Sequence, residues 1–126
     1  MQSTMTSAVN KQASQWHKVC HLSELVINSG VCALVQGQQI ALFALKTAKT
    51  EAPSVYALSN FDPIGLANVM SRGIIGSIQG EPVIASPLYK QHYSLLSGKC
   101  LEQSEYALEV YDTHIIDEWL HVSLKC

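Results

Sequence analysis

The sequence has little positive charge and no cluster of basic residues. Arg72 is the only arginine among 8 Lys+Arg residues, against 10 Asp+Glu residues, and the formal net charge is −2. Proteins that bind nucleic acid neutralise phosphates with clustered lysine and arginine side chains. Nucleic acid is therefore not an expected partner.

Long apolar runs are also missing. No stretch approaches the roughly 20 apolar residues that a membrane-spanning helix requires. Residues 1–14 are polar and lack the hydrophobic block of a secretion signal. We therefore predict a cytoplasmic protein with no membrane partner.

The cysteines show no metal-binding or redox spacing, because no two of them form a C-x-x-C pair. In a reducing compartment we expect free thiols. Their default role is that of small buried hydrophobic residues, except at the chain end, where we expect exposure. The four are Cys20, Cys32, Cys100 and Cys126.

Catalytic motifs are absent too. There is no G-x-S-x-G elbow for a nucleophile, and the pair Gly73 and Gly76 lacks the third glycine of a dinucleotide loop. No two carboxylates share an apolar setting, and we expect Glu102, Glu105 and Glu109 to be solvated. The sequence therefore predicts no catalytic residue on this chain.

Two histidines have a spacing that suits a metal site. His17 and His21 are four residues apart in a segment that we predict to be a strand, where this spacing puts both on one face. The alternative is a half-exposed edge strand, and we favour it.

What the sequence does contain is the composition of a packed domain: 126 residues, 48% hydrophobic and 14% charged. We predict a flexible tail over residues 1–14 and one domain over 15–126. Short apolar runs separated by turn residues are typical of an all-β sandwich or barrel. The expected strands are 16–20, 31–35, 39–45, 55–59, 74–78, 83–86, 92–95, 106–111 and 119–124.

The sequence also predicts one hairpin turn, two short helical turns and one solvated loop. The clearest hairpin turn is Gln36-Gly37-Gln38, which lies between two apolar runs. Only two short segments suggest helix, 23–25 and 65–70, each long enough for one turn. The loop 46–54 is expected to be solvated.

Two segments, 57–64 and 83–89, resemble the cluster-binding loops of Rieske proteins. In that family the loops carry C-P-H or C-x-H and C-P-x-H, and two cysteines and two histidines bind a [2Fe-2S] cluster. The resemblance places the cysteine positions at Asp62 and Ser86 and the histidine positions at Ile64 and Tyr89. Pro63 and Pro87 of the motifs are retained.

All four ligand positions are therefore substituted. Isoleucine has no lone pair to donate, and a serine hydroxyl is a poor replacement for a thiolate at iron. The resemblance thus implies a Rieske-like antiparallel β-sandwich or barrel whose smaller, degenerate cluster-binding subdomain holds neither metal nor cofactor.

Residues 59–63, 66–73 and 85–91 are most similar to one Rieske-like family, the small subunits of NADH-dependent nitrite reductase, assimilatory or respiratory. The resemblance implies an accessory subunit whose partner is a large subunit. That partner would carry FAD, siroheme and an iron-sulfur cluster and would reduce nitrite to ammonium. Any reductase activity would belong to the complex.

Two other interpretations remain. One is a free-standing Rieske-like module that binds a small ligand or a regulator at the vacated cluster site. The other, an active Rieske ferredoxin, fails because the ligands are missing. For the subunit we expect Arg72, Ile64 and Tyr89 to contact the large subunit, since they lie near the end of the domain where the cluster loops meet. Against this, Ile64 and Tyr89 can instead fill the cavity of the lost cluster, and Arg72 can cap a loop carbonyl.

Overall fold

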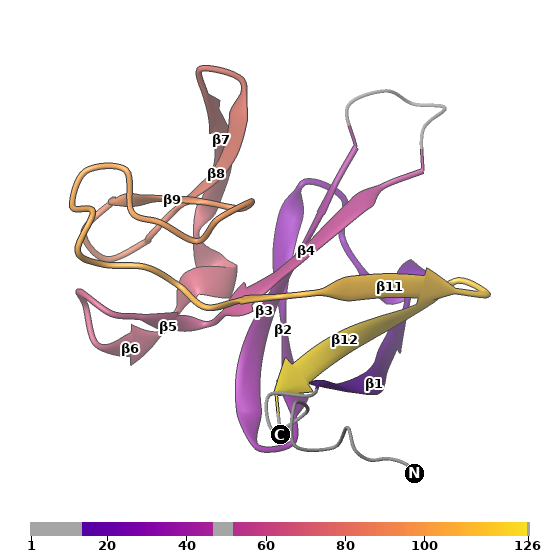
Figure 1. The fold of residues 1–126 in the computed structure, drawn as a ribbon. Helices are drawn as coiled ribbons and strands as arrows, with labels where there is room; N and C mark the ends of the chain where they lie inside the picture. The colour runs from indigo at the N-terminus through magenta and orange to yellow at the C-terminus, as the bar shows by residue number, and fades with distance from the viewer. Residues whose placement is uncertain (1–13, 47–51, 126) are drawn as a thin grey trace, which may run out of the picture.

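The computed structural model describes residues 14–46 and 52–125, and these form an all-β fold, as predicted (Figure 1). Two larger sheets make up one part of the molecule, and a smaller part holds a two-stranded and a three-stranded sheet. The strands of the larger part are β1 (Ser14–His21), β2 (Ser29–Val35), β3 (Gln38–Leu45), β4 (Ser54–Ser59), β10 (Val110–Tyr111), β11 (Thr113–Ile116) and β12 (Trp119–Lys125). Those of the smaller part are β5 (Phe61–Asp62), β6 (Ala67–Asn68), β7 (Ile74–Ile78), β8 (Glu81–Ala85) and β9 (His92–Ser94).

The four-stranded sheet β10-β4-β3-β2 is the central layer of the molecule. Strand β3 is apolar on both faces, and its residues alternate between two hydrophobic cores. Ile40 and Leu42 pack toward the sheet β1-β12-β11, whereas Ala41 and Phe43 pack toward the smaller part. A strand buried on both faces has a nearly continuous hydrophobic sequence, and this one does.

Tight turns join the paired strands. Gln36-Gly37 connects β2 to β3, and both residues have positive φ, as in type I′ hairpin turns. The predicted hairpin is therefore present. Asp117-Glu118 connects β11 to β12 with positive φ at both residues and without any glycine. The sequence analysis missed β11 because this turn lacks the usual residues.

Two other predictions of secondary structure were wrong. Residues 65–70 do not form a helical turn: Leu66 has a positive φ, β6 pairs with β5, and a 3₁₀ turn, η3, follows over Met70–Arg72. Residues 106–111 are not one strand, since only Val110–Tyr111 pairs with β4. A backbone hydrogen bond from Cys100 to the carbonyl of Tyr106 folds the preceding segment back on itself instead.

The two histidines in β1 do not share a face. The register of β1 against β12 shifts between Lys18 and Cys20, and this bulge moves His21 to the opposite face from His17. His21 packs edge-on against Trp119, with 5.3 Å between the ring centroids. The spacing that suggested a metal site therefore does not produce one.

Cysteine burial follows strand alternation. Cys20 and Cys100 are buried free thiols, as expected for small hydrophobic residues. Cys32 is exposed, contrary to expectation, because its neighbours Val31 and Ala33 take the core-facing side of β2. Cys126 lies outside the described residues.

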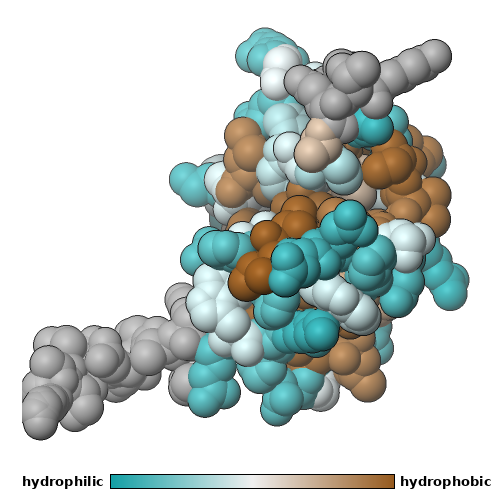
Figure 2. All heavy atoms as spheres, turned by 90° about the vertical axis from the view of Figure 1, so that its right-hand side faces the viewer, coloured by the Kyte–Doolittle hydropathy of each residue, from teal (hydrophilic) through white to brown (hydrophobic). Residues whose placement is uncertain are grey.

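The predicted tail, residues 1–14, lies outside the described residues except for Ser14, which begins β1 and pairs with Lys125. Most of the predicted loop 46–54 is outside them as well, and its last residue, Ser54, begins β4. No helix in the described part of the chain is long and apolar enough to cross a membrane. Figure 2 shows the side with the β11–β12 hairpin, where hydrophobic residues lie in separate groups among hydrophilic ones.

Candidate functional site

Two loops of the smaller part lie against each other at the positions singled out by the sequence. The first loop joins β5 to β6 and the second follows β8. The Ser86 hydroxyl donates a hydrogen bond of 2.5 Å to Oδ2 of Asp62. Asp62 is 0% exposed and Ser86 is 2% exposed. The two positions expected for cluster cysteines are therefore joined by a buried hydrogen bond.

The carboxylate of Asp62 organises the first loop. Its Oδ1 accepts hydrogen bonds from the backbone N–H groups of Ile64 at 2.9 Å and Gly65 at 3.0 Å. The Tyr93 hydroxyl donates to the same oxygen at 3.5 Å. A buried carboxylate is tolerated when its oxygens are hydrogen-bonded in this way.

These contacts fix the charge state of the site. Burial by itself raises the pKa of Asp62, but the hydrogen bonds from Ser86, Gly65 and Ile64 outweigh it and hold the pKa below its ordinary value. Burial, and then the nearby charge of Asp62, raises the pKa of Tyr93. At neutral pH the site therefore holds one carboxylate and one neutral phenol.

The same loop design occurs three times. In each loop, a side-chain oxygen of residue i accepts a hydrogen bond from the backbone N–H of residue i+2. The backbone carbonyl of residue i accepts one from the N–H of residue i+4, which has a positive φ. The three pairs, each four residues apart, are Asp62 and Leu66, Ser86 and Lys90, and Ser94 and Gly98. Only the third pair places glycine at the left-handed position, so the first two loops hold strained residues.

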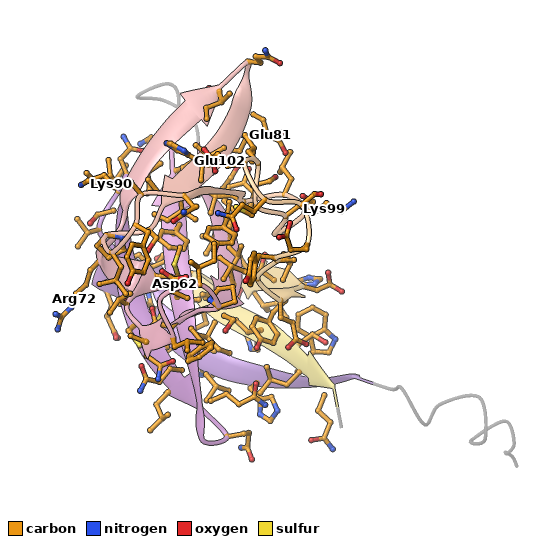
Figure 3. The ribbon with its side chains drawn as sticks, turned by 90° about the vertical axis from the view of Figure 1, so that its left-hand side faces the viewer. Asp62, Arg72, Glu81, Lys90, Lys99 and Glu102 are labelled. Atoms are coloured by element: carbon orange, nitrogen blue, oxygen red, sulfur yellow. The ribbon has the colours of Figure 1, made fainter. Side chains whose placement is uncertain are left out.

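The remaining candidate residues occupy different environments. Ile64 is half-buried and packs against the core of the smaller part. Tyr89 is 63% exposed. Arg72 ends η3, is exposed, and projects away from the molecule, whereas Asp62 lies in the interior (Figure 3). The structure thus brings Asp62 and Ser86 together and leaves Tyr89 and Arg72 on the surface.

The residues present do not fit a [2Fe-2S] cluster. Of the four positions, only Asp62 offers a strong metal ligand, and its carboxylate oxygens are engaged by Ser86 and the loop N–H groups. Among residues 14–46 and 52–125, no group of three or more His, Cys, Asp or Glu side chains is arranged to hold a metal ion. Asp62 and Ser86 therefore serve as hydrogen-bond partners of each other and not as ligands of a cluster.

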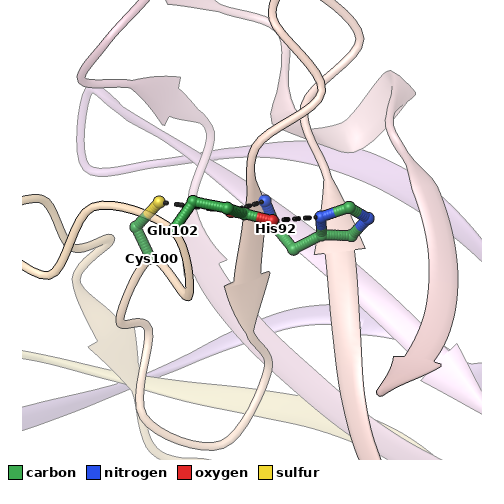
Figure 4. Close-up of polar contacts among 3 residues, drawn as sticks. All are labelled: His92, Cys100 and Glu102. Carbon is green, nitrogen blue, oxygen red and sulfur yellow. Dashed lines mark hydrogen bonds and ion pairs between the residues drawn. The ribbon is translucent and has the colours of Figure 1, made fainter.

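A second polar cluster joins β9 to the loop after it (Figure 4). The Nδ1 of His92 lies 2.7 Å from Oε2 of Glu102, and the backbone N–H of His92 donates to Oε1 at 2.8 Å. The Cys100 thiol donates to Oε1 at 3.7 Å. The thiol thus faces the carboxylate and not the imidazole, so the cluster lacks the thiol–imidazole contact of a catalytic cysteine.

Glu102 is exposed, as expected, with a side chain that is 45% exposed, but it also contacts His92. Slight burial acts to raise the pKa of Glu102, but its hydrogen bonds with His92 prevail and lower it. Sequence reasoning missed this contact because the partners are ten residues apart and meet only when the loop folds back onto β9. Glu81, which accepts a hydrogen bond from Ser94, was missed because this contact depends on the pairing of β8 with β9.

Comparisons with known proteins agree on one family. The model of the Rieske-like [2Fe-2S] domain matches residues 15–123. The chain is 39% identical over 104 residues to the nitrite reductase (NADH) small subunit of Salmonella typhimurium, covering 82% of this chain and 93% of that one.

A solved structure and a longer protein are also similar. The solution structure of the nitrite reductase [NAD(P)H] small subunit from Erwinia carotovora superposes with a TM-score of 0.71 at 43% identity, covering 86% of this chain and 81% of that one. In Klebsiella oxytoca, the nitrite reductase [NAD(P)H] large subunit contains a segment 36% identical over 100 residues, which is 79% of this chain and 10% of the large subunit.

Proposed function

The chain belongs to the family of Rieske-like domains that includes the nitrite reductase (NADH) small subunits, and we propose from this that it is the non-catalytic small subunit of such an enzyme. The observation that carries the proposal is the 39% identity over 93% of the Salmonella typhimurium small subunit. A match over nearly the whole length covers the complete domain and not a shared motif alone.

The proposed partner is a nitrite reductase large subunit. In Klebsiella oxytoca, a related segment lies within the large-subunit polypeptide itself. A domain held in the same chain is kept near its partner at a high effective concentration. A separate chain such as this one must reach the same proximity by binding, which supports a protein–protein interface.

The proposed role is structural and not redox. The Asp62–Ser86 hydrogen bond occupies the position where two cluster cysteines are expected. Electron transfer from NADH to nitrite would then take place on the large subunit, for which we propose FAD, siroheme and an iron-sulfur cluster. The small subunit would stabilise or complete that chain in the cytoplasm.

The free-standing binding module is not favoured. Its ligand would have to enter the vacated cluster site, but 2.5 Å between the Ser86 hydroxyl and the Asp62 carboxylate leaves no space between those positions. The similar proteins named above are also subunits of one enzyme.

Co-expression with the large subunit from the same organism tests the proposal. We expect this chain to co-elute with an affinity-tagged large subunit, and we expect the complex to reduce nitrite with NADH faster than the large subunit alone or to lose activity more slowly. If the untagged chain does not co-elute at micromolar concentration, the subunit assignment is wrong.

A further inference from the structure

Large apolar side chains are exposed on and beside the two loops. Leu66 and Ile74 are each 71% exposed, Tyr89 is 63% exposed and Leu88 is 44% exposed. Single exposed apolar residues are common on protein surfaces, whereas a group of them marks an interaction site. Whether these four residues lie together therefore decides whether they indicate an interaction site.

Gly65 lets Leu88 approach the first loop. A side chain at Gly65 would place its Cβ 2.4 Å from Cδ1 of Leu88, so Leu88 lies directly on the first loop beside Leu66. Ile74 pairs with Ala85, the residue that precedes the second loop. The group therefore runs across both loops and onto the first residue of β7.

Within residues 60–91, the exposed charges beside this group are positive. Residues 60–91 contain four charged side chains, and of these Asp62 is buried while Glu81 begins β8 at the far end of its hairpin. Arg72 and Lys90 are exposed, and neither forms an ion pair within the described ranges. Figure 3 shows both at one edge of the molecule. Because the two acidic and two basic residues of this segment cancel, the net charge of −2 comes from the rest of the chain.

The loops that carry these residues are fixed before binding. The Asp62–Ser86 hydrogen bond joins them, and the carbonyls of Asp62 and Ser86 close them on Leu66 at 2.7 Å and Lys90 at 3.0 Å. A surface that is already ordered loses less conformational entropy when it binds.

We propose, resting on the subunit role above, that this surface docks on the large subunit at an apolar patch bordered by carboxylates. We call it the loop surface, and it consists of Leu66, Arg72, Ile74, Leu88, Tyr89 and Lys90. Unpaired cations at the edge of an apolar group on an acidic protein select a partner of opposite charge. Ile64 supports the surface from below, since it packs on the core.

Binding of purified variants to the purified large subunit, measured by calorimetry at low and high salt, tests the proposal. Tyr89→Ala and Arg72→Glu should each weaken binding about tenfold or more. Lys90→Gly removes the cation and also relieves a positive φ of 65°, so it should weaken binding without lowering the melting temperature. High salt should weaken the wild-type complex more than the Arg72→Glu complex.

Matched controls lie elsewhere on the surface. Leu34→Ser removes an apolar side chain that is 73% exposed on β2. Lys99→Glu reverses the charge of an exposed lysine that lies far from Arg72 in Figure 3. Both variants should bind as tightly as the wild type. Thermal melting of every variant separates a lost contact from a lost fold.

The outcomes are distinguishable. If the wild type does not bind the large subunit, the subunit role itself fails. If the wild type binds and the loop-surface variants bind equally well while folded, only the docking surface is wrong. If those variants abolish self-association in sedimentation but leave large-subunit binding intact, the surface is covered by a second copy, and the proposed occupant is wrong.

Discussion

At the scale of single residues, the main feature is a buried carboxylate that organises two loops. Asp62 accepts hydrogen bonds from its own loop through Ile64 and Gly65 and from the other loop through Ser86. A [2Fe-2S] cluster would tie the same two loops together through its ligands. If Asp62 and Ser86 stand at two ligand positions, as the resemblance implies, their hydrogen bond provides a cross-link between the loops without a metal.

The ionised form of Asp62 should stabilise the fold in a pH-dependent way. Its native pKa is lowered, so this contribution is present above the unfolded value of about 3.9 and is lost as pH falls through the native value. At pH 7 we expect Asp62→Asn to lower the free energy of unfolding by about 1–3 kcal/mol. The difference from wild type, measured by urea denaturation, should shrink toward pH 2.5.

The exposed carboxylate of Glu105 provides the control for this experiment. Glu105→Gln should change stability by less than about 0.5 kcal/mol at either pH. A constant difference between wild type and Asp62→Asn across the whole pH range would show that Asp62 does not stabilise the fold through its charge.

Metal content is a second test at the residue scale. Because Asp62, Ile64, Ser86 and Tyr89 replace all four expected ligands, the anaerobically purified chain should be colourless and hold no stoichiometric iron. Iron analysis and a visible spectrum check this. About two iron atoms per chain, the content of a [2Fe-2S] cluster, would contradict the proposed structural role.

At the scale of elements, the β11–β12 hairpin shows a local conflict between sequence and backbone. Asp117 and Glu118 have φ values of 52° and 68°, a conformation that glycine and asparagine adopt at lower cost. The strands pair nevertheless, because Leu120 and Val122 are buried in the core shared with β3. Tertiary burial therefore overrides an unfavourable turn.

Replacing this turn with Asn-Gly should stabilise the protein. The double variant Asp117→Asn, Glu118→Gly matches the preferred type I′ sequence, and we expect a gain of about 0.5–1 kcal/mol in unfolding free energy. Gln36→Asn produces the same Asn-Gly turn between β2 and β3 and serves as the control. Its stabilisation should be smaller, because Gly37 is already present there. An unchanged or lower melting temperature for the double variant would show that the Glu118 side chain, which lies 3.5 Å from His21, compensates for the strain.

At the scale of the whole molecule, β3 contributes side chains to two separate hydrophobic cores, one on each face of its sheet. One face packs on the sheet β1-β12-β11, and the other supports the smaller part with its two loops. The loop surface thus belongs to the part of the molecule that packs on this face of the central sheet. This arrangement suits a subunit whose proposed task is to present a fixed surface to a partner.

The first residues of the chain should not contribute to this architecture. Residues 1–13 are polar and precede β1, which begins at Ser14. Deleting them should leave the melting temperature of the isolated domain within about 2 °C of the wild type. A deletion that lowers the unfolding free energy by more than about 2 kcal/mol would show instead that the segment packs on the domain.

The sequence by itself determined the fold class and most strands, because these depend on local alternation and on turn residues such as Gln36-Gly37. The family was implied by the resemblance of residues 57–64 and 83–89 to the cluster-binding loops of Rieske proteins. The resemblance also implied which positions replace the cluster ligands, since the motif keeps Pro63 and Pro87. The sequence missed β11, whose turn has no glycine, and the bulge in β1 that separates His17 from His21.

Only the tertiary structure decided which substituted positions meet. Asp62 and Ser86 are 24 residues apart and form a buried hydrogen bond, whereas Tyr89, three residues after Ser86, points to solvent. The contact between His92 and Glu102 likewise depends on a loop that folds back. Such pairings follow from how strands pack around a shared core, and that packing is not encoded in any local pattern.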